Sequence, residues 1–489
     1  MKALTITKPT ENITLLKHLT KLGITVSADC AGLGTCGKCK VKVISGEFVY
    51  VNTNEPYLPD EYGFILSCKA VLRSEEAVIE VPFDACSDNA FVKSTDKSLS
   101  VDNLSVALDI GTTTLCAALI DSDKKAVVKT VSALNPQKNF GADVMSRITA
   151  SKENLSDLQS VLLSKIRNMI SDLTTGPIKM LAVTGNTTML HLFCGVSPLK
   201  MGTYPFTPEF LELKHFSGSE LNLNAEKIYV LPSASAFIGS DVTSALIYLD
   251  ILEQKEPCVL LDIGTNGEMV LFTGTDNGSK LFATSSAAGP ALEGVGVSCG
   301  SGGVTGAINE VELKNGSFKF STINNAAPTG ICTSGLIDLI AALLQNGMLD
   351  ETGYLECEQF DIYANNNTTV YVNQDDIRSI QLAKSAIRAA LDTLLFDNGF
   401  DYAKIEKIYL SGGIGYYLNP QNAAKIGLFP QSVADKIKPM GNTSLLGAAE
   451  YILAPEKREI LSEICNKITT IELNKSETFN NAFIEHMYF

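Results

Sequence analysis

Two segments of this chain repeat the same short pattern, and the repeat limits the folds open to it. Residues 104–121 read LSVALDIGTTTLCAALID, and residues 258–274 read CVLLDIGTNGEMVLFTG. In each segment an apolar strand runs into Asp-Ile-Gly-Thr, and a second apolar strand leaves the turn. Because the same strand–turn–strand unit recurs far along the chain, the sequence predicts two related α/β halves.

The turn in each repeat has the composition of a phosphate site. Glycine lets a phosphate approach the backbone closely, and the N–H and hydroxyl groups of the turn are hydrogen-bond donors. The aspartate at the head of each turn, Asp109 or Asp262, is placed to hold water on a Mg²⁺ ion. The donors that we expect at the phosphates are Gly111, Thr112, Thr113, Gly264, Thr265 and Asn266.

A different chemistry is indicated near the start of the chain, where cysteines gather. The pattern C-x5-C-x2-C-x28-C is formed by Cys30, Cys36, Cys39 and Cys68. Thiolates suit zinc or iron–sulfur centres, but zinc ribbons usually contain two C-x2-C pairs. One such pair, with an outlying cysteine and a remote one, favours a [2Fe–2S] cluster. The spacing resembles that of ferredoxins of the adrenodoxin kind, and we expect the other cysteines to lie in the core.

The length of 489 residues is enough for several compact units. Polar residues with little periodicity separate the cysteine-containing part from the repeats, and we expect the first unit to be mobile on this linker. The units that we expect are a [2Fe–2S] ferredoxin-like domain at 1–86, a linker at 87–103, a first α/β half at 104–254, a second α/β half at 255–455, and a C-terminal tail at 456–489.

Charge and hydropathy exclude some classes of partner. The net charge of −15 at pH 7 argues against nucleic acid and anionic membranes as partners. No apolar run reaches the roughly 18 residues that span a bilayer, and the N-terminus lacks a signal-peptide core. We therefore expect a cytoplasmic protein, in which 12 cysteines indicate metal or redox work rather than disulfides.

The paired turns resemble the two phosphate loops of the actin, Hsp70 and sugar-kinase superfamily of ATPases. IYLSGGIGYY at 408–417 resembles the adenosine motif of that superfamily. Residues 235–249 and 441–452 resemble its first and second connecting helices. The resemblance implies that backbone at the nucleotide is supplied by Gly412, Gly413 and Gly415.

The same resemblance implies roles for two acidic residues. A polar residue of the first connecting helix often orients the attacking water, and Asp241 is the candidate here; the alternative is an acid that favours the dipole at a helix start. Residues 285–294 resemble the segment that passes near the nucleotide. In that segment Glu293 either accepts hydrogen bonds from the ribose or is a surface acid on a helix.

A ferredoxin domain fused to this ATPase fold resembles the reductive activators of corrinoid proteins. Matching segments are found at 135–148, 185–198, 287–294, 330–338 and 374–387. The resemblance implies a multidomain α/β fold, with an N-terminal β-grasp domain followed by a duplicated actin/Hsp70-like ATPase. It also implies ATP-dependent electron transfer from a [2Fe–2S] cluster to Co(II) of a corrinoid protein, which regenerates Co(I). The implied cofactors are the cluster, ATP and Mg²⁺, and the implied partners include an external low-potential electron donor. The sequence leaves open whether the protein forms a homodimer.

Three other functions remain open from the sequence. One is an ATP-driven activator of another low-potential metalloenzyme, although such activators bridge a [4Fe–4S] cluster between two subunits, and the N-terminal cysteine set argues against that arrangement. Another is a redox-regulated kinase of the same superfamily, and the third is a nucleotide-regulated scaffold without catalysis.

Overall fold

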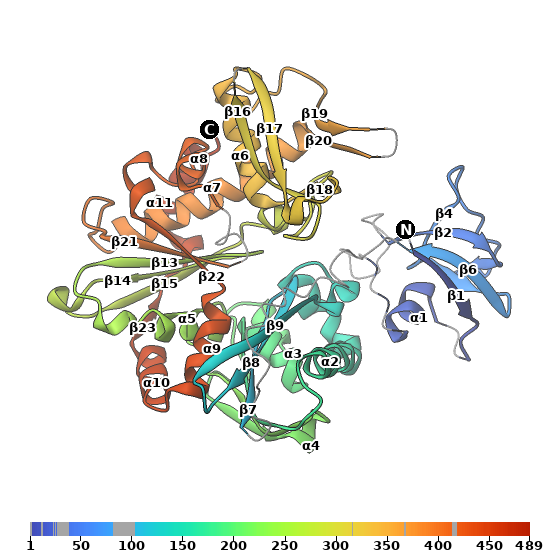
Figure 1. Ribbon diagram of the computed structural model, residues 1–489, viewed down its shortest axis with the longest axis horizontal. Coiled ribbons are helices and arrows are strands. Elements are labelled where there is room, and N and C mark those ends of the chain that lie inside the picture. Colours follow the sequence, from blue (N-terminus) through green and yellow to red (C-terminus); the bar gives the residue numbers. More distant parts are fainter. Residues whose placement is uncertain are drawn as a thin grey trace.

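The structure is a computed structural model, and it describes residues 2–10, 13–22, 24, 26, 39–81, 103–314, 316–365, 368–412 and 418–489. A small N-terminal unit, blue in Figure 1, lies beside a larger body with two lobes. The expected linker lies outside the described residues apart from Asn103.

The N-terminal unit is an antiparallel sheet with one helix packed against it. Its sheet contains, in order, β1 (Lys2–Thr7), β6 (Glu76–Val81), β2 (Lys40–Ser45) and β4 (Phe64–Leu66). A separate ribbon pairs β3 (Phe48–Tyr50) with β5 (Ala70–Leu72). Helix α1 (Leu15–Lys21) begins where the Thr14 hydroxyl accepts the N–H of Lys17, and it buries Leu15 and Leu19 in the core of this unit.

The first lobe is built on a mixed sheet around the first repeat. Its strands, in order, are β11 (Lys214–Ser217), β12 (Ala225–Val230), β10 (Ile178–Gly185), β7 (Leu104–Ile110), β8 (Thr114–Asp121) and β9 (Ala126–Leu134). The repeat forms the β7–β8 hairpin, and β10 runs parallel to β7 on the other side. The central strands β7, β8 and β10 are mostly buried on both faces, because helices cover one face and elements shared with the second lobe cover the other.

The second lobe has a sheet with the same arrangement around the second repeat. Its strands, in order, are β22 (Ile437–Gly441), β21 (Lys407–Ser411), β13 (Cys258–Ile263), β14 (Gly267–Phe272), β15 (Leu281–Ser286) and β23 (Ile468–Thr470). From β22 to β15, order and strand direction match those from β12 to β9 in the first lobe. Since β23 joins this sheet, the segment expected as a separate tail is part of the second lobe.

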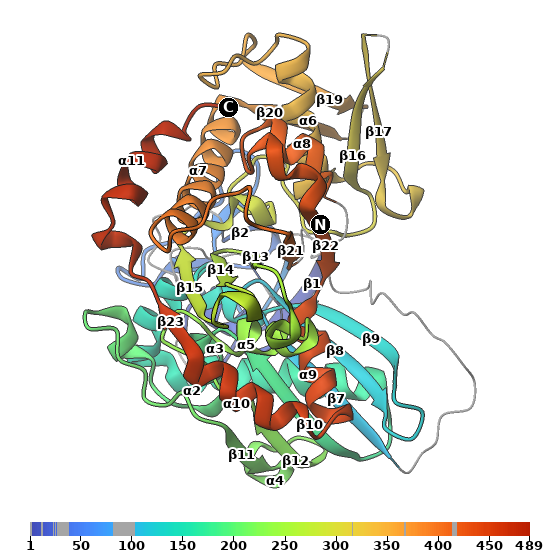
Figure 2. The ribbon, with the colours of Figure 1, turned by 90° about the vertical axis from the view of Figure 1, so that its left-hand side faces the viewer.

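Helices cover the outer faces and connect the lobes. The first lobe carries α2 (Val144–Leu173), α3 (Thr187–Cys194), α4 (Gly218–Leu221) and α5 (Ser240–Tyr248). The second carries α6 (Thr333–Gln345), α7 (Gln374–Phe396), α8 (Pro420–Lys425), α9 (Thr443–Leu453), α10 (Lys457–Lys467) and α11 (Glu477–Glu485). Figure 2 shows α11 beside α7 on the outside, with α5 and α9 toward the middle of the molecule.

Helices α5 and α9 cross at very close range between the two sheets. A Cβ atom on Gly447 of α9 would lie 1.9 Å from the carbonyl oxygen of Ser244 in α5, so only glycine fits there. The Ser444 hydroxyl donates to the carbonyl of Asp241 at 2.8 Å. An apolar core shared by both sheets surrounds this crossing.

Two smaller β elements extend from the second lobe. One sheet contains β17 (Ser317–Thr322), β16 (Ala307–Lys314) and β18 (Gly330–Ile331), and a ribbon pairs β19 (Gln359–Ala364) with β20 (Thr369–Asn373). Of the helices in the described part of the chain, none is long and apolar enough to cross a membrane.

Candidate functional site

The first Asp-Ile-Gly-Thr turn is a tight hairpin loop at the end of β7. The N–H of Gly111 donates to the carbonyl of Thr114 at 3.0 Å. A Cβ atom at Gly111 would lie 2.5 Å from that same carbonyl oxygen, so the loop can close only around glycine. We call residues 109–114 loop 1.

Three asparagines hold loop 1, and each also begins a helix. The side-chain oxygens of Asn135, Asn186 and Asn442 cap a 3₁₀-helix, α3 and α9, respectively. Because an asparagine amide has donors as well as an acceptor, each NH₂ group is left to bond elsewhere. These groups donate to the carbonyl of Gly111 at 2.9 Å, the hydroxyl of Thr112 at 3.0 Å and the carboxylate of Asp109 at 2.8 Å.

The second turn, which we call loop 2 (residues 262–268), also closes a hairpin but has different neighbours. It is tighter than loop 1, because Ile263 pairs with Gly267 whereas Ile110 pairs with Leu115. The N–H of Gly264 donates to the carbonyl of Asn266 at 2.9 Å. The Ser411 hydroxyl donates to the Asp262 carboxylate at 3.2 Å. Gly412 follows with a φ of +90°, and a Cβ there would lie 2.7 Å from the Asp262 carboxylate. The adenosine-like segment thus begins against loop 2, while Gly413 and Gly415 lie outside the described residues.

The two loops meet at one carboxylate. Glu293 accepts a hydrogen bond from the Thr113 hydroxyl at 2.9 Å and another from the Thr265 hydroxyl. Its segment is the short 3₁₀-helix η5 (Pro290–Glu293), between two glycines of positive φ, and not the α-helix considered from the sequence. Glu293 therefore joins loop 1 to loop 2 across the lobes.

Three aspartates named from the sequence share one region. Burial is the largest cause that raises the pKa of each: to about 7 for Asp109, about 6 for Asp262 and about 8 for Asp241. The charge of Asp262 raises the pKa of the other two further. Carboxylates that repel one another in a cleft are stabilised by a cation, so this set has the chemistry of a magnesium-binding nucleotide site.

Asp241 lies in the first turn of α5, as the resemblance implied. Its carboxylate accepts the N–H of Val242 at 2.8 Å, and the positive end of the helix favours its charge. The charges of Asp262 and Asp109 act on it in the opposite direction. Both roles considered from the sequence therefore fit its position at the helix start.

The iron–sulfur prediction is tested in part by the described cysteines. The sulfur atoms of Cys39 and Cys68 lie 3.2 Å apart and are buried. The hydrogen bond from Cys68 is the largest of the causes that lower the pKa of Cys39 to about 6, which favours the thiolate that iron requires. Cys30 and Cys36 lie outside the described residues, so their role stays a prediction.

Comparison with known proteins matches the parts of the chain in which these two groups of residues lie. A family model described as a 2Fe-2S iron-sulfur cluster binding domain matches residues 2–73. A model described as the RACo middle region matches residues 104–254, and one described as the C-terminal, ASKHA domain of RACo matches residues 256–489. The chain belongs to the RACo family.

Relatives of this RACo family member extend over most of its length. It is 29% identical to corrinoid activation enzyme RamQ of Eubacterium limosum, over 82% of this chain and 72% of the relative. It is 28% identical to [Co(II) methylated amine-specific corrinoid protein] reductase of Methanosarcina barkeri, over 78% of this chain and 76% of the relative. A solved structure titled reductive activator for corrinoid, iron-sulfur protein matches with a TM-score of 0.75 and 28% identity, covering 98% of this chain and 96% of that one.

Sequence reasoning missed a further carboxylate of this RACo protein. Glu268 leaves loop 2 directly opposite Asp262 in the β13–β14 hairpin, so the two side chains lie on the same face. Burial, and then the charges of Asp241 and Asp262, raise its pKa well above the usual value. Its place six residues after Asp262 in the motif was visible, but only the strand pairing shows the direction of its side chain.

A buried arginine behind loop 1 was also missed. Arg147 of α2 is fully buried, and it donates to the carbonyl of Gly141 at 2.9 Å. Its Nη2 has no hydrogen-bond partner among the described residues. Burial lowers the pKa of Arg147 to about 9, and the charges of Asp143 and Glu293 oppose that shift. A buried cation near the carboxylate that joins both loops suits a site for anionic phosphates.

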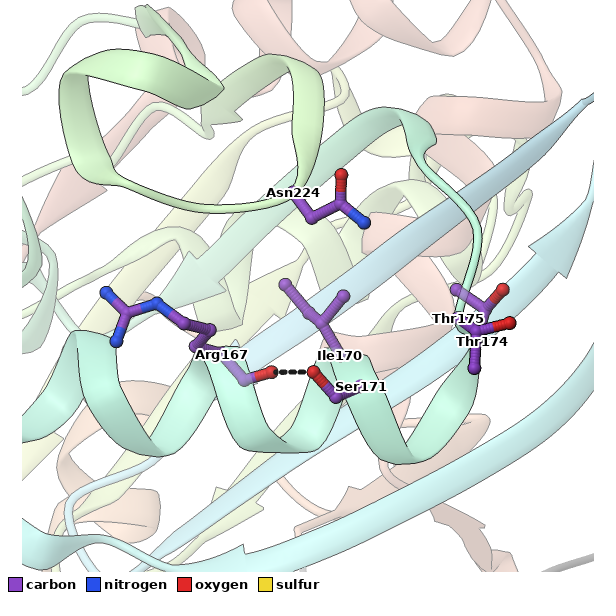
Figure 3. A pocket seen from close by; sticks show the side chains of 6 residues that line it. All are labelled: Arg167, Ile170, Ser171, Thr174, Thr175 and Asn224. Carbon is purple, nitrogen blue, oxygen red and sulfur yellow. Dashed lines mark hydrogen bonds between the residues drawn. The ribbon is translucent and has the colours of Figure 1, made fainter.

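The described side chains contain no group of three or more His, Cys, Asp or Glu residues gathered closely enough to ligate a metal directly. A separate surface cavity of about 280 Å³ lies near the end of α2, lined by Arg167, Ile170, Ser171, Thr174, Thr175 and Asn224 (Figure 3). It contains none of the site carboxylates, so we do not assign the nucleotide to it.

Proposed function

We propose that this protein is an ATP-dependent reductive activator of a corrinoid protein. It transfers one electron from a [2Fe–2S] cluster to Co(II) of the corrinoid, which becomes the Co(I) form needed for methyl transfer. The main support is the union, in one chain, of an iron–sulfur unit with a pair of phosphate-type loops that meet at Glu293. The names of its relatives RamQ and the Co(II) corrinoid protein reductase support the corrinoid as the electron acceptor.

We propose that the two lobes are a duplicated actin/Hsp70-like ATPase, with domain limits at 104–254 and 255–455, and that residues 456–489 extend the second lobe, where β23 joins its sheet. The matching order and direction of the strands in the two sheets supports this origin. The expected nucleotide site lies between loop 1 and loop 2. Donors for the phosphates would be Gly111, Thr112, Thr113, Gly264, Thr265 and Asn266, with Gly412, Gly413 and Gly415 at the adenosine.

Within that site we expect the carboxylates to have different roles. Asp109 and Asp262 would hold the water shell of Mg²⁺, since each lies at a strand end beside a phosphate loop. Asp241 would accept a hydrogen bond from the attacking water, because its raised pKa brings it near the operating pH of a general base. Arg147 would supply the positive charge that balances the phosphates.

The cluster would be held by Cys30, Cys36, Cys39 and Cys68. When bound, it supplies one-electron redox chemistry, and an external low-potential donor would reduce it again. Plant-type centres have reduction potentials of roughly −400 mV. Electron transfer from an ordinary cluster of this kind to Co(II) is therefore thermodynamically unfavourable. Movement of the lobes on nucleotide binding can change the surroundings of the cobalt in the bound corrinoid protein. Such a change can favour the Co(I) state.

Anaerobic reduction of a Co(II) corrinoid protein, followed by the absorbance of Co(I), tests this function. We expect full reduction with MgATP and a chemical reductant, and little without ATP or with Asp262→Ala. Cys39→Ser should abolish reduction while ATP still binds. Asp276→Ala, an exposed acid of the same lobe, is the matched control and should behave as wild type. Undiminished reduction by Asp262→Ala would refute the role of ATP.

A further inference from the structure

The N-terminal unit contacts the first lobe through one buried asparagine. The Oδ1 atom of Asn139 accepts the N–H of Val26 at 3.0 Å. Its Nδ2 group donates to the Thr20 hydroxyl at 2.8 Å and to the Ile24 carbonyl at 3.4 Å. Asn139 is 4% exposed. Every hydrogen-bond partner recorded for this side chain thus belongs to the iron–sulfur unit, although the sequence predicted a unit that is mobile on its linker.

A contact of this kind is specific and reversible. Buried amides are stabilised only while their partners are in place, and water can replace those partners when the unit leaves. At the edge of the contact, Lys17 of α1 forms an ion pair with Asp157 of α2 at 3.3 Å. This pair is exposed and adds little to the free energy of docking. Figure 1 shows α1 as the element of the N-terminal unit that faces α2.

Asn139 lies in a short 3₁₀-helix, η1 (Pro136–Phe140), whose other end is fixed to loop 1. Asn135 caps η1 by accepting the N–H of Gln137 at 3.0 Å. The backbone N–H of Asn135 donates to the carbonyl of Thr113 at 2.8 Å, and its side chain donates to Gly111. One turn of helix therefore separates the residue that holds loop 1 from the residue that holds the iron–sulfur unit.

The segment between these two residues is itself held firmly. The Gln137 side chain is fully buried and donates to the carbonyl of Leu158 in α2 at 3.0 Å. On the other side of loop 1, the Thr113 hydroxyl bonds to Glu293, at the expected phosphate position. A path of hydrogen bonds and one short helix therefore runs from Glu293 through Thr113, Asn135 and η1 to the iron–sulfur unit.

We propose that η1 couples the phosphate site to the docking of the iron–sulfur unit, so that each event favours the other. The proposal rests on the nucleotide-binding function proposed above. Docking fixes η1 through Asn139, and η1 fixes the backbone of loop 1 through Asn135. A loop that is already ordered loses less conformational entropy when it binds a ligand. A triphosphate bound in loop 1 therefore stabilises the docking of the iron–sulfur unit on the first lobe. Loss of the triphosphate weakens this docking.

Because coupling free energies are reciprocal, a change that weakens docking must weaken nucleotide binding by the same factor. Thr20→Val tests this from the iron–sulfur side. It removes the acceptor for Asn139 with little change of volume, in a unit that carries no nucleotide-site residue. Asn139→Ala tests it from the lobe. Asn224→Ala is the matched control, since this asparagine of the same lobe only donates to the Gly176 carbonyl at a remote surface (Figure 3).

The measurement is the Kd of MgATP for the cluster-loaded full-length chain, by calorimetry. We expect Thr20→Val and Asn139→Ala to raise the Kd about fivefold or more, the range of typical coupling, with Asn224→Ala unchanged. Hydrogen exchange of peptides covering α1 and Val26 gives the reciprocal readout, and a nonhydrolysable ATP analogue should slow it severalfold in wild type but not in Asn135→Ala.

The outcomes separate the two proposals. If wild type binds no MgATP, the proposed function fails. If wild type binds it and both docking variants bind it equally well, with unaltered cluster spectra and exchange, η1 does not couple the sites and this inference is refuted. A loss of affinity confined to Asn139→Ala, with Thr20→Val as wild type, also refutes it, because that pattern indicates only local damage to the lobe.

Discussion

Loop 1 and loop 2 begin with the same four residues and each closes a β-hairpin, yet the two hairpin loops differ in length and are held in different ways. Loop 1 receives hydrogen bonds from three asparagine helix caps, one of which begins the path to the iron–sulfur unit. Loop 2 receives hydrogen bonds from the hydroxyls of Ser411 and Ser285 and is packed against Gly412. The repeated motif therefore specifies the hairpin and its aspartate, whereas the neighbouring elements decide what each loop is connected to.

The largest expected effect concerns the two aspartates themselves. Asp262→Asn and Asp109→Asn should each lower the rate of ATP hydrolysis by about 100-fold or more, the scale for loss of one preorganised electrostatic group. Asp262→Asn should be the more severe, because its charge acts on both Asp109 and Asp241. Steady-state phosphate release measures this, with Asp276→Asn as control. Equal and small losses would show that neither loop holds the metal.

The two glycines of the repeated motif should differ in their contribution to stability. Gly111→Ala places a Cβ 2.5 Å from the Thr114 carbonyl and should cost about 1–3 kcal/mol of unfolding free energy. Gly264→Ala meets nothing closer than 3.8 Å and should stay within about 0.5 kcal/mol of wild type. Denaturant unfolding of both variants measures the difference. A similar cost at both positions would mean that the loops are equally constrained.

The charge of Glu293, the carboxylate that joins the loops, should weaken the binding of the nucleotide. Glu293→Gln keeps an acceptor for Thr113 and Thr265 but removes a negative charge from the expected phosphate position. We expect the Kd of ATP to fall about tenfold, which corresponds to about 1.4 kcal/mol. Asp276→Asn is the matched control, since Asp276 is an exposed acid of the same lobe outside the site. Weaker binding by Glu293→Gln would instead support the ribose role that the resemblance implied.

The smallest expected effect is on the pH dependence of stability. The pKa of Asp109 is raised to about 7 and that of Asp262 to about 6, above the roughly 3.9 of an unfolded chain. Between these values the folded state binds more protons, so stability falls as pH rises. Without divalent metal, the melting temperature should drop by roughly 2–4 °C from pH 5 to pH 8. Asp109→Asn should reduce the fall of the melting temperature near pH 7, and Asp262→Asn should reduce it near pH 6. A melting temperature that rises with pH would contradict the assignment.

Local patterns made several features of the site predictable. The strands that flank Asp109 and Asp262 are apolar, and glycine closes each turn, so both hairpins form where the sequence predicts them. The helix at Asp241 was predicted instead from the superfamily resemblance, and it forms over Ser240–Tyr248. The nature of the Glu293 segment was not, because Pro290 and two positive-φ glycines restrict it to a short 3₁₀-helix.

The residues that connect the parts were not predictable from local pattern. Asn135, Asn186 and Asn442 each precede a helix, and this is an ordinary signal for a cap. Nothing in the sequence says that their second polar group reaches loop 1. Arg147 and Asn139 likewise look like polar residues of a helix or turn until the fold buries them. The prediction that Cys30 and Cys36 ligate the cluster rests on the spacing of the cysteines.

The crossing of α5 and α9 determines how the lobes can move. With the Gly447 backbone against the Ser244 carbonyl, neither helix can slide along the other without a steric clash, whereas rotation about the point of contact leaves the packing there intact. Opening of the proposed nucleotide site would then be a hinge motion with its axis beside Asp241. A small angular change at this axis would produce its largest displacements at the outer ends of the lobes, far from the proposed site.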